Sequence, residues 1–438
     1  MGYENTDATR AHGRWAGKFE ILPRCRLESM DDLKVAYTPG VADPCYAIYE
    51  NPQEVYRLTR KANTVAIVTN GTAILGISAK GPEASIPVME GKAILFKACG
   101  GVDAIPVPIR STRTEDIVRT IKDISPMYGG IILEDIASPE CFEVCRALEA
   151  DGEFDIPIFH DDQQGTATVT YAALINALEL TGRTLARCRI AILGAGAAGI
   201  AIARFLKHLG AEDVVLADRR GILSRDRVYE GKDREKKLAA GQTNPRNLSG
   251  PVDEALRGAD VFIGVSGKDG LGRSEDEPQR VRQAQEKIRL MARGAVVFSM
   301  ANPIPEIAPD AALAAGAAVA ATGSSKFKNQ VNNLLAFPGL FRGILDIRAG
   351  GVNYEMMAAA AEAIAACAGK ATLDRIVPHP LAPQVAPAVA RAVAEAGIRT
   401  GKARATPPLD KIEADCRAQI ERIRECVRWM LDRYEVPV

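Results

Sequence analysis

The stretch AILGAGAAG, residues 191–199, decides the fold of this chain. Gly194, Gly196 and Gly199 complete the pattern G-x-G-x-x-G between an apolar run and the start of a helical pattern. Glycines here allow a tight turn and a close approach of the backbone to a pyrophosphate, which then lies on the unpaired N–H groups of the helix. A glycine turn without a ligand is the alternative interpretation. The pattern favours an α/β domain that binds a dinucleotide.

The acidic residue expected at the adenine ribose follows this loop by about 20 residues. The run VVLAD ends in Asp218, whose carboxylate can accept hydrogen bonds from ribose hydroxyls. Arg219 and Arg220 come next and offer positive charge to a 2′-phosphate, so NAD and NADP both stay open, and we favour NAD. The predicted cofactor contacts are Gly194, Ala195, Gly196, Ala197, Ala198, Gly199, Asp218 and Arg219.

Apolar runs around the loop predict a doubly wound, Rossmann-like parallel sheet. Its strands are expected at residues 189–193, 214–217, 260–265, 295–300 and 317–321. Two polar insertions, residues 219–246 and 267–286, interrupt this pattern and are rich in charge. We expect both to be surface excursions from the sheet without a chemical role.

The residues before this sheet predict a smaller α/β unit. Its strands are expected at residues 64–69, 130–133 and 156–159, and a helix at 113–124. A further helical pattern at residues 165–180 leads into the second unit. We therefore expect an N-terminal domain at 1–163 with the catalytic and metal residues, a dinucleotide-binding domain at 164–345, and a C-terminal helical segment at 346–438. That last segment is expected to return to the first domain or to brace a second subunit.

Bulk composition excludes several classes of protein. Lysine plus arginine and aspartate plus glutamate both total 55, so no net charge draws the chain to nucleic acid or to an anionic membrane. The nine cysteines are scattered and form no C-x-x-C pair, which argues against a disulfide framework or a zinc site. An apolar signal core and a bilayer-length apolar run are both missing from the sequence. We expect a cytoplasmic protein that acts on small molecules.

Carboxylates follow two strands of the first unit. Glu134 and Asp135 come directly after residues 130–133, and Asp161 and Asp162 follow FH at 159–160. Ligands gather at the carboxyl ends of parallel strands, and converging carboxylates repel one another unless a cation neutralises them. All-oxygen ligation suits Mg²⁺ or Mn²⁺. The alternative is that these residues only cap the next helix. His160 beside them is expected to be a satisfied structural histidine.

Beyond these local patterns, the chain resembles the malic enzyme family. The blocks that carry the resemblance are AYTPGVADPC (36–45), VMEGKAILFK (88–97), EDI (134–136), HDDQQGTA (160–167), the glycine loop, SMANP (299–303) and NQVNNLLAFPG (329–339). Their order across most of the chain is far more specific than any single block, and they resemble the short bacterial form. The resemblance implies NAD(P)-dependent oxidation and decarboxylation of (S)-malate to pyruvate with a divalent metal ion, and decarboxylation of oxaloacetate.

The resemblance also implies roles for single residues. Lys92 corresponds to the base that takes the malate hydroxyl proton, which needs a lysine whose pKa is lowered by burial or a nearby cation. Asp161 corresponds to the residue that orients its ammonium group. Tyr37 corresponds to the acid that protonates the enolate carbon. Without the resemblance, Lys92 reads as a surface charge and Tyr37 as an ordinary tyrosine.

The remaining implied roles concern metal and substrate. Glu134, Asp135 and Asp162 match the metal ligands. Asn302 and Asn332 match amides that bind the substrate carboxylate, with Asn333 a close rival. Lys80 and Glu83 stand in a segment that is more glycine-rich in relatives, and Lys80 could bind the distal carboxylate or face water.

Two rival functions stay open. A malolactic-type enzyme would use the same residues, retain NAD and release lactate. A non-catalytic nucleotide-sensing protein would need neither Lys92 nor the carboxylates. The resemblance implies at least a homodimer, in which the charged C-terminal helix could serve assembly, and we expect no phosphotransacetylase domain.

Overall fold

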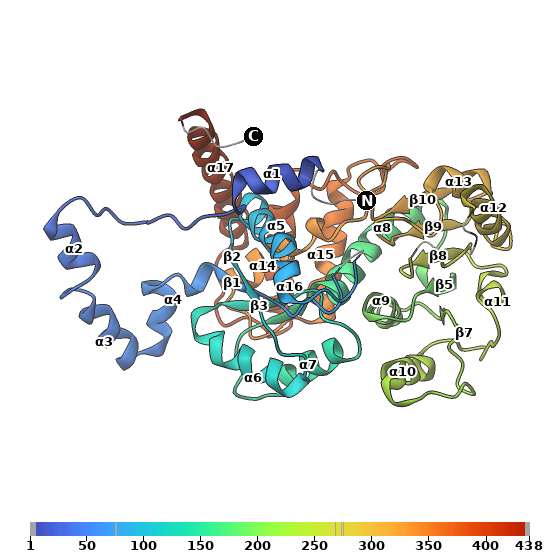
Figure 1. Ribbon diagram of the computed structural model, residues 1–438, viewed down its shortest axis with the longest axis horizontal. Helices are drawn as coiled ribbons and strands as arrows, with labels where there is room; N and C mark the ends of the chain where they lie inside the picture. The colour runs from blue at the N-terminus through green and yellow to red at the C-terminus, as the bar shows by residue number, and fades with distance from the viewer. Residues whose placement is uncertain (1–5, 75–76, 268, 273, 275, 434–438) are drawn as a thin grey trace.

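Two β-sheets form the cores of the two halves of the molecule in the computed structural model (Figure 1). The structure describes residues 6–74, 77–267, 269–272, 274 and 276–433. The ends of the predicted outer domains (1–5 and 434–438) and positions 268, 273 and 275 of the second predicted insertion therefore lie outside the described residues.

The first sheet has the strand order β2-β1-β3-β4, and all of its pairs are parallel. β1 reads TVAIVT and is buried along its whole length, as is typical of a parallel strand covered on both faces. Its strands are β1 (Thr64–Thr69), β2 (Asp103–Pro108), β3 (Gly130–Leu133) and β4 (Ile158–His160), and the helices between them are α5 (Pro82–Gly100), α6 (Thr114–Ile124) and α7 (Glu140–Glu149). β1 and β3 match the predicted bounds. Sequence reasoning missed β2 because its two prolines argue against a central strand. β2 lies at the edge of the sheet, where prolines are tolerated.

A continuous helical segment connects the two sheets. It starts as the π-helix Asp161–Gly165 directly after β4 and continues as α8 (Thr166–Leu180). Most of α8 is buried, because it packs against α9 and α15. Asp162, the metal-ligand candidate that follows β4, therefore lies on the segment that leads into the second half of the molecule.

The second sheet is doubly wound, with the order β10-β9-β8-β5-β6-β7. Five of its strands are parallel, as predicted, and β7 is an additional antiparallel edge. The strands are β5 (Arg189–Leu193), β6 (Asp213–Asp218), β7 (Gly221–Ile222), β8 (Val261–Gly264), β9 (Val296–Ser299) and β10 (Val319–Thr322). The helices are α9 (Ala197–His208), α10 (Arg234–Gln242), α11 (Val252–Leu256), α12 (Glu277–Ile288) and α13 (Pro309–Ala314).

The two polar insertions are not mere surface excursions. Residues 219–246 contain β7 and α10, and they bury Leu223, Ala239 and the carboxylate of Glu235. Residues 267–286 contain most of α12, whose Ala284 is buried. The charge that suggested a solvated loop is largely paired: Glu235 accepts hydrogen bonds from Arg146 and Arg204.

The chain returns to the first half after β10. The last helices are α14 (Phe337–Asp346), α15 (Tyr354–Cys367), α16 (Val385–Arg399) and α17 (Leu409–Arg433). α14 and α17 both pack on α5, and the ring of Phe341 meets those of Phe96 and Phe159 edge-on. The predicted return of the C-terminal helices to the first half is confirmed.

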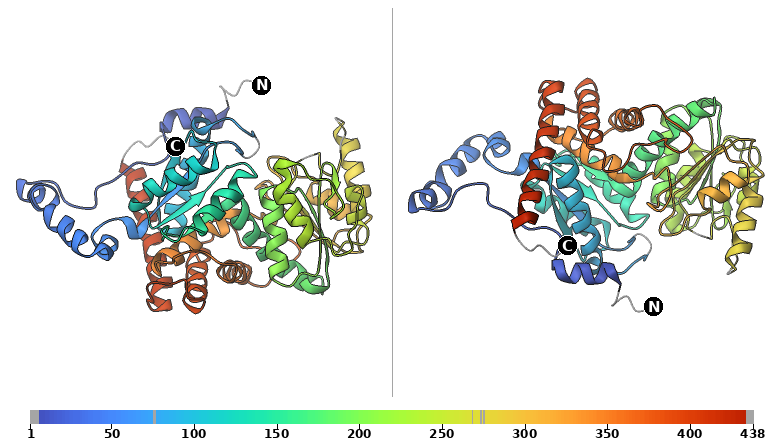
Figure 2. Two further views of the ribbon diagram at one scale, coloured as in Figure 1. Left: turned by 90° about the horizontal axis from the view of Figure 1, so that it is seen from below. Right: turned by 90° about the horizontal axis from the view of Figure 1, so that it is seen from above.

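The N-terminal segment leaves the body as an arm (Figures 1 and 2). After α1 (Asp7–Trp15), which lies beside α5, the chain extends outward into α2 (Met30–Ala36) and α3 (Ala42–Glu50) and returns through α4 (Val55–Leu58) to β1. None of these four helices has a buried residue.

Within the described residues, no helix combines the length and the apolar character that crossing a bilayer requires.

Candidate active site

The carboxylates predicted at the strand ends converge at one edge of the first sheet. Because β3 and β4 are parallel neighbours, Glu134 and Asp135 emerge beside Asp161 and Asp162. The backbone N–H of Asp135 donates to Asp162 Oδ2 at 3.0 Å. Glu134, Asp135 and Asp162 each place a carboxylate oxygen within 4.8 Å of the other two. The predicted grouping is therefore present.

Lys92 reaches this group from α5. Its side chain is 8% exposed, and its ammonium donates to Glu134 Oε2 at 2.7 Å and to Asp161 Oδ2. Nζ also lies 4.6 Å from the centroid of the Phe337 ring, which closes one side of the site. A lysine that would read as a solvated charge in the sequence is thus buried between two carboxylates.

Asn333 fixes the position of Asp161. Its amide Nδ2 donates to the backbone oxygen of Asp161 at 3.2 Å and to Asp161 Oδ2 at 3.1 Å. The same nitrogen lies 3.1 Å from Thr166 Oγ1. Asn333 therefore acts here as a positioning residue for the partner of Lys92.

Burial and mutual repulsion shape the ionisation of the site. Burial raises the pKa of Glu134 well above its usual range, against the opposing charge of Lys92. Burial and the neighbouring Asp161 raise the pKa of Asp162 to about 6. Burial lowers the pKa of Lys92, but Asp161 and Glu134 outweigh it and the net shift is upward. Burial therefore does not produce a net lowering of the Lys92 pKa, and the lowering that a base requires would have to come from a nearby cation.

The donor set fits a hard divalent cation. Four carboxylates, those of Glu134, Asp135, Asp161 and Asp162, face a single ammonium, so negative charge is in excess. The three candidate ligands offer only oxygen, which suits Mg²⁺ or Mn²⁺ better than zinc. Burial raises the pKa values of Glu134 and Asp162 most, and repulsion between the carboxylates adds to it; a cation would relieve that repulsion.

His160 precedes these aspartates and is fully buried, as expected of a structural histidine. Among the described residues, neither of its ring nitrogens has a hydrogen-bond partner. Its Nδ1 lies 3.8 Å from Asp162 Oδ2. Burial and the charge of Lys92 lower the pKa of His160 to about 3, which keeps the ring neutral.

The glycine loop has the geometry that a pyrophosphate needs. Gly194 has a φ of 117°, and a Cβ there would lie 2.6 Å from the carbonyl oxygen of Val265. A Cβ at Gly199 would lie 1.7 Å from the oxygen of Gly194, so this glycine allows α9 to pack on the loop. A Cβ at Gly196 would meet nothing within 4 Å. The open space beside Gly196, at the N-terminus of α9, is where a phosphate can approach.

Asp218 lies at the end of β6, as predicted, but its carboxylate already accepts hydrogen bonds from two cationic side chains. Arg227 donates to both of its oxygens at 3.0 and 2.9 Å, and Lys236 donates to Oδ2 at 2.8 Å. Both cations come from the insertion at 219–246, so that segment forms part of the predicted cofactor site. The expectation that it has no chemical role is not supported by this geometry.

The other predicted residues lie outside the carboxylate group. Asn302 is half-buried after β9, and its amide lies 3.5 Å from the oxygen of Met300. Asn332 caps the following turn by accepting from the N–H of Leu334 at 2.8 Å. Lys80 is exposed, and Arg219 is exposed beside Asp218. Tyr37 is 65% exposed and lies on the arm.

Sequence reasoning missed two residues that shape these loops. A Cβ at Gly165 would lie 2.1 Å from Asp161 Oδ1, so only glycine leaves room for that carboxylate. Glu306 is fully buried and accepts from the N–H of Ser266 at 2.7 Å and of Ala301 at 3.3 Å, which ties together the loops after β8 and β9. The sequence did offer a signal for each residue. Gly165 follows Asp161 by four residues, and Glu306 is a carboxylate in an apolar segment.

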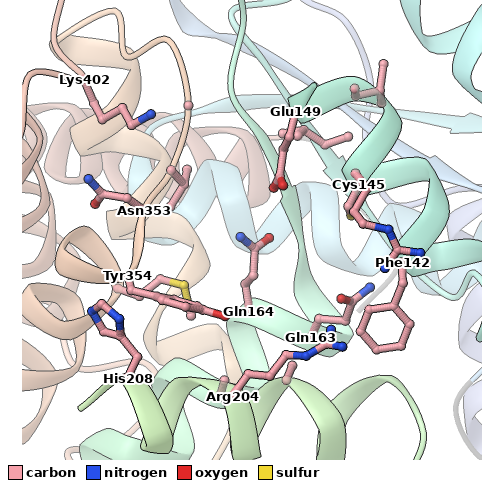
Figure 3. Close-up of a pocket in the computed structure, with 18 of the residues that line it drawn as sticks. Phe142, Cys145, Glu149, Gln163, Gln164, Arg204, His208, Asn353, Tyr354 and Lys402 are labelled. Atoms are coloured by element: carbon pink, nitrogen blue, oxygen red, sulfur yellow. The ribbon is translucent and has the colours of Figure 1, made fainter. Parts of the chain in front are cut away.

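A cavity of about 670 Å³ lies on the other side of the π-helix (Figure 3). Gln163 and Gln164 line it from the π-helix, Glu149 from α7 and Arg204 from α9. Its lining does not include Glu134, Asp135 or Asp162. The cavity is therefore separate from the carboxylate group, although both share the segment 161–165.

Comparisons with known proteins identify the family of the chain. Residues 16–114 match the model of the malic enzyme N-terminal domain, and residues 163–398 match that of the malic enzyme NAD-binding domain. The chain is 45% identical to a bifunctional malic/malolactic enzyme of Bacillus subtilis, over 93% of this chain and 96% of that protein. It is 46% identical to an NAD-dependent malic enzyme of Geobacillus stearothermophilus, over 89% of this chain and 78% of that protein.

A solved structure leads to the same family. The malic enzyme from Pyrococcus horikoshii superposes with a TM-score of 0.88 at 42% identity, over 94% of each chain. These matches make the chain an enzyme with a nicotinamide cofactor, and relatives named for NAD and for NADP both occur among them. The chain belongs to the malic enzyme family.

Proposed function

We propose that the chain oxidises and decarboxylates (S)-malate to pyruvate and carbon dioxide while reducing a nicotinamide cofactor, and that it also decarboxylates oxaloacetate. The observation that carries this proposal is the buried Lys92, which donates to Asp161 and to Glu134, one of the three converging carboxylates. A lysine next to a cation site can remove a proton from a hydroxyl group adjacent to a carboxylate.

Glu134, Asp135 and Asp162 would hold the divalent cation, Mg²⁺ or Mn²⁺. When bound, the ion would polarise the hydroxyl and adjoining carboxylate of malate and stabilise the negative charge left by the departing carbon dioxide. Its charge would also oppose the pull of Glu134 on the Lys92 proton, which favours the neutral amine that a base requires.

Lys92 accepts the hydroxyl proton of malate at Nζ. It can do so only after Nζ has lost a proton, and Asp161 Oδ2 is a contacting carboxylate that can take it. Asn333 keeps Asp161 in that position through its two hydrogen bonds to Asp161. The buried surroundings of Lys92, including the ring of Phe337, limit proton exchange with water.

The loop 194–199 and the N-terminus of α9 hold the cofactor pyrophosphate. When bound, the nicotinamide ring would accept the hydride from C2 of malate. The malate carboxylates are bound by Asn302 and Asn332, which follow β9 and β10. Tyr37 donates its phenolic proton to C3 after carbon dioxide leaves, as the resemblance implies.

The charges around Asp218 favour NADP over the NAD that the sequence alone suggested. Arg227 and Lys236 already occupy the carboxylate that would bind the ribose hydroxyls of NAD. With Arg219 beside them, these side chains carry more positive than negative charge, which suits a 2′-phosphate.

The absorbance of reduced nicotinamide tests the overall reaction. With malate and Mn²⁺, we expect a metal-dependent rise in absorbance and an equal amount of pyruvate. If neither pyruvate nor lactate forms, the proposal is wrong.

Lysine variants test the role of the base. Lys92→Ala should abolish malate oxidation while the variant stays folded by circular dichroism. Lys97→Ala is the matched control, because Lys97 lies on the same helix, is 41% exposed and pairs with Asp103 away from the carboxylate group. Near-normal turnover in Lys92→Ala would remove Lys92 from the mechanism.

The same assay with NADP and NAD tests the cofactor preference. Lys236→Ala should lower kcat/KM for NADP far more than for NAD, because it removes charge from the predicted 2′-phosphate site. Arg225→Ala on the same segment is the control, since the guanidinium of Arg225 donates to the backbone oxygen of Pro245 instead. Equal losses with both cofactors would contradict the preference.

A malolactic activity is the second candidate, because the Bacillus subtilis relative is named for both reactions. Lactate in the products, without net reduced cofactor, would identify it.

A further inference from the structure

The cavity behind the π-helix is large enough for an organic ligand. Its volume of about 670 Å³ falls within the range of roughly 300–1,000 Å³ that small-molecule sites occupy. Both halves of the molecule line it, since Phe142 and Glu149 belong to α7, Arg204 to α9 and Tyr354 to α15. A ligand there would contact both halves without entering the carboxylate group.

The walls of the cavity are partly apolar. In Figure 3, Tyr354 and Phe142 stand on opposite sides of it. The ring of Tyr354 also contacts that of His208, with the ring centroids 4.8 Å apart. The apolar and aromatic lining includes Phe142, Leu148, Phe154, Ile156, Ile158 and Tyr354. Such walls suit a ligand with a ring or a hydrocarbon body.

Two cationic side chains bring unpaired donors to the cavity. Arg204 donates from Nη2 to Glu235 at 3.0 Å and from Nε to Gln242 at 3.4 Å, which leaves its Nη1 without a partner among the described residues. The ammonium group of Lys402 has no salt-bridge partner in the described part of the chain, although its charge acts on Glu149. Both groups can therefore donate to a bound acceptor.

Gln164 adds a donor whose orientation is fixed. Its Oε1 accepts from the backbone N–H of His160 at 2.8 Å. Because the oxygen is engaged there, the other end of the amide is Nε2, which can only donate. Gln164 lines the cavity and belongs to the π-helix that also carries Asp161 and Asp162. A ligand bound to Gln164 would thus contact the segment that holds a metal-ligand candidate.

Cations outnumber acids in the lining. The arginines and the lysine are Arg146, Arg204 and Lys402. The acids are Glu149 and Glu355, and Glu355 lies 3.5 Å from His208. Burial raises the pKa of Glu149, against the charges of Lys402 and Arg146, so its negative charge forms less readily than usual. The cavity therefore favours an anion over a cation.

We propose that this cavity binds an organic carboxylate with a ring or hydrocarbon body, and that its binding changes the cation affinity of the carboxylate group. The ligand carboxylate accepts from Arg204, Gln164 and Lys402, and its body lies between Phe142 and Tyr354. The π-helix carries the effect, because Gln164 and Asp162 are two residues apart. The second part of this inference rests on the proposed function, since it assumes the metal site.

Calorimetry with 3-phenylpropionate as the probe tests the cavity alone. With EDTA present and no cofactor, we expect one molecule to bind per chain with a Kd of about 1 mM or tighter. Inorganic phosphate, which is an anion without an apolar body, should bind at least tenfold more weakly. If 3-phenylpropionate does not bind, or if phosphate binds equally well, the inference is wrong.

Variants locate the bound probe. Lys402→Gln removes a cation without breaking a salt bridge, and Ala201→Leu fills part of the cavity from α9 without removing any charge. Each should weaken the binding of 3-phenylpropionate at least fivefold. Lys207→Gln is the control, because Lys207 is on the same helix but donates to the oxygen of Glu212 outside the cavity. Wild-type affinity in both cavity variants would overturn the site.

Mn²⁺ titrations test the coupling. Saturating 3-phenylpropionate should change the Kd for Mn²⁺ at least threefold, and Mn²⁺ should change the Kd for the probe by the same factor. Gln164→Glu keeps an acceptor for the N–H of His160 but loses the donor, so it should lose both effects. An unchanged Mn²⁺ affinity with the probe bound would contradict the coupling. If Mn²⁺ fails to bind even without the probe, the proposed metal site is wrong instead.

Discussion

Gly165 shows how one residue controls the geometry of the site. It ends the π-helix that starts at Asp161, and the absence of a side chain leaves room for the Asp161 carboxylate next to Asn333. Any larger residue must push either the carboxylate or the helix. The position of Lys92 depends on the same contact, because Asp161 binds its ammonium.

Gly165→Ala should therefore destabilise the protein by roughly 1–3 kcal/mol and lower kcat. Denaturant unfolding and steady-state kinetics would measure the two effects. Gly241→Ala in α10 is the control, because a Cβ there meets nothing within 4 Å. Equal behaviour of the two variants would contradict this role of Gly165.

Asp218 makes a pH-dependent contribution to stability. Burial opposes its ionisation, but hydrogen bonds from Arg227 and Lys236 outweigh burial and lower its pKa to about 2. An aspartate in the unfolded chain has a pKa of about 3.9, so the folded state binds the Asp218 proton more weakly than the unfolded state does. The stabilisation is complete above that value and is lost as the pH falls through the folded pKa.

Between pH 4 and pH 2, roughly, wild type should lose stability more steeply than Asp218→Asn, which has no carboxylate to protonate. Urea unfolding at several pH values would measure this difference in the pH dependence of stability. Asp226→Asn, an exposed change on the same segment, should keep the wild-type slope. Parallel curves for wild type and Asp218→Asn would refute the linkage.

Two glycines in the turn between β5 and α9 have different structural roles. Gly199 has no room for a Cβ, because the oxygen of Gly194 would be 1.7 Å away, whereas Gly196 faces open space. The first is needed for helix packing and the second for the approach of a ligand.

Gly199→Ala should lower the melting temperature with or without cofactor. Gly196→Ala should melt like wild type but bind NADP at least tenfold more weakly in calorimetry. The two variants serve as controls for each other. Wild-type binding in Gly196→Ala would show that the open space does not receive the pyrophosphate.

The proposed metal ligands come from both halves of the whole molecule. Glu134 and Asp135 follow β3 of the first sheet, while Asp162 belongs to the π-helix that continues into α8 and contacts α9. A cation bound to all three would hold the connecting segment against the first sheet. Binding to the folded state alone adds stability by mass action.

Mn²⁺ at about 100 times its Kd should stabilise the protein by about 2.7 kcal/mol, and EDTA should reverse this. Thermal unfolding would measure the shift. Asp162→Asn should abolish it, whereas Glu153→Gln, at a side chain that is 91% exposed, should keep it. An undiminished shift in Asp162→Asn would mean that the cation binds elsewhere.

The sequence by itself determined the features that local patterns encode. The glycine loop, the strands β1, β3 and β5 and the carboxylates at the strand ends all follow from short runs, because parallel strands bring their carboxyl ends to one edge. The return of the last helices to the first half of the molecule was also predicted from the sequence. The edge strands β2 and β7 could not be predicted from the sequence. They are stabilised by pairing with a neighbouring strand rather than by the preferences of their own residues.

Only the tertiary structure decided the environment of each charge. Lys92 and Asp161 are 69 residues apart, and Asn333 lies 172 residues from Asp161, so no local pattern shows that they meet. The same holds for Asp218, whose cations come from a segment that looked like a solvated loop. Ionisation depends on burial and on neighbouring charges, which the fold brings together from distant positions. The sequence determined which groups are present, and folding decided which of them act on one another.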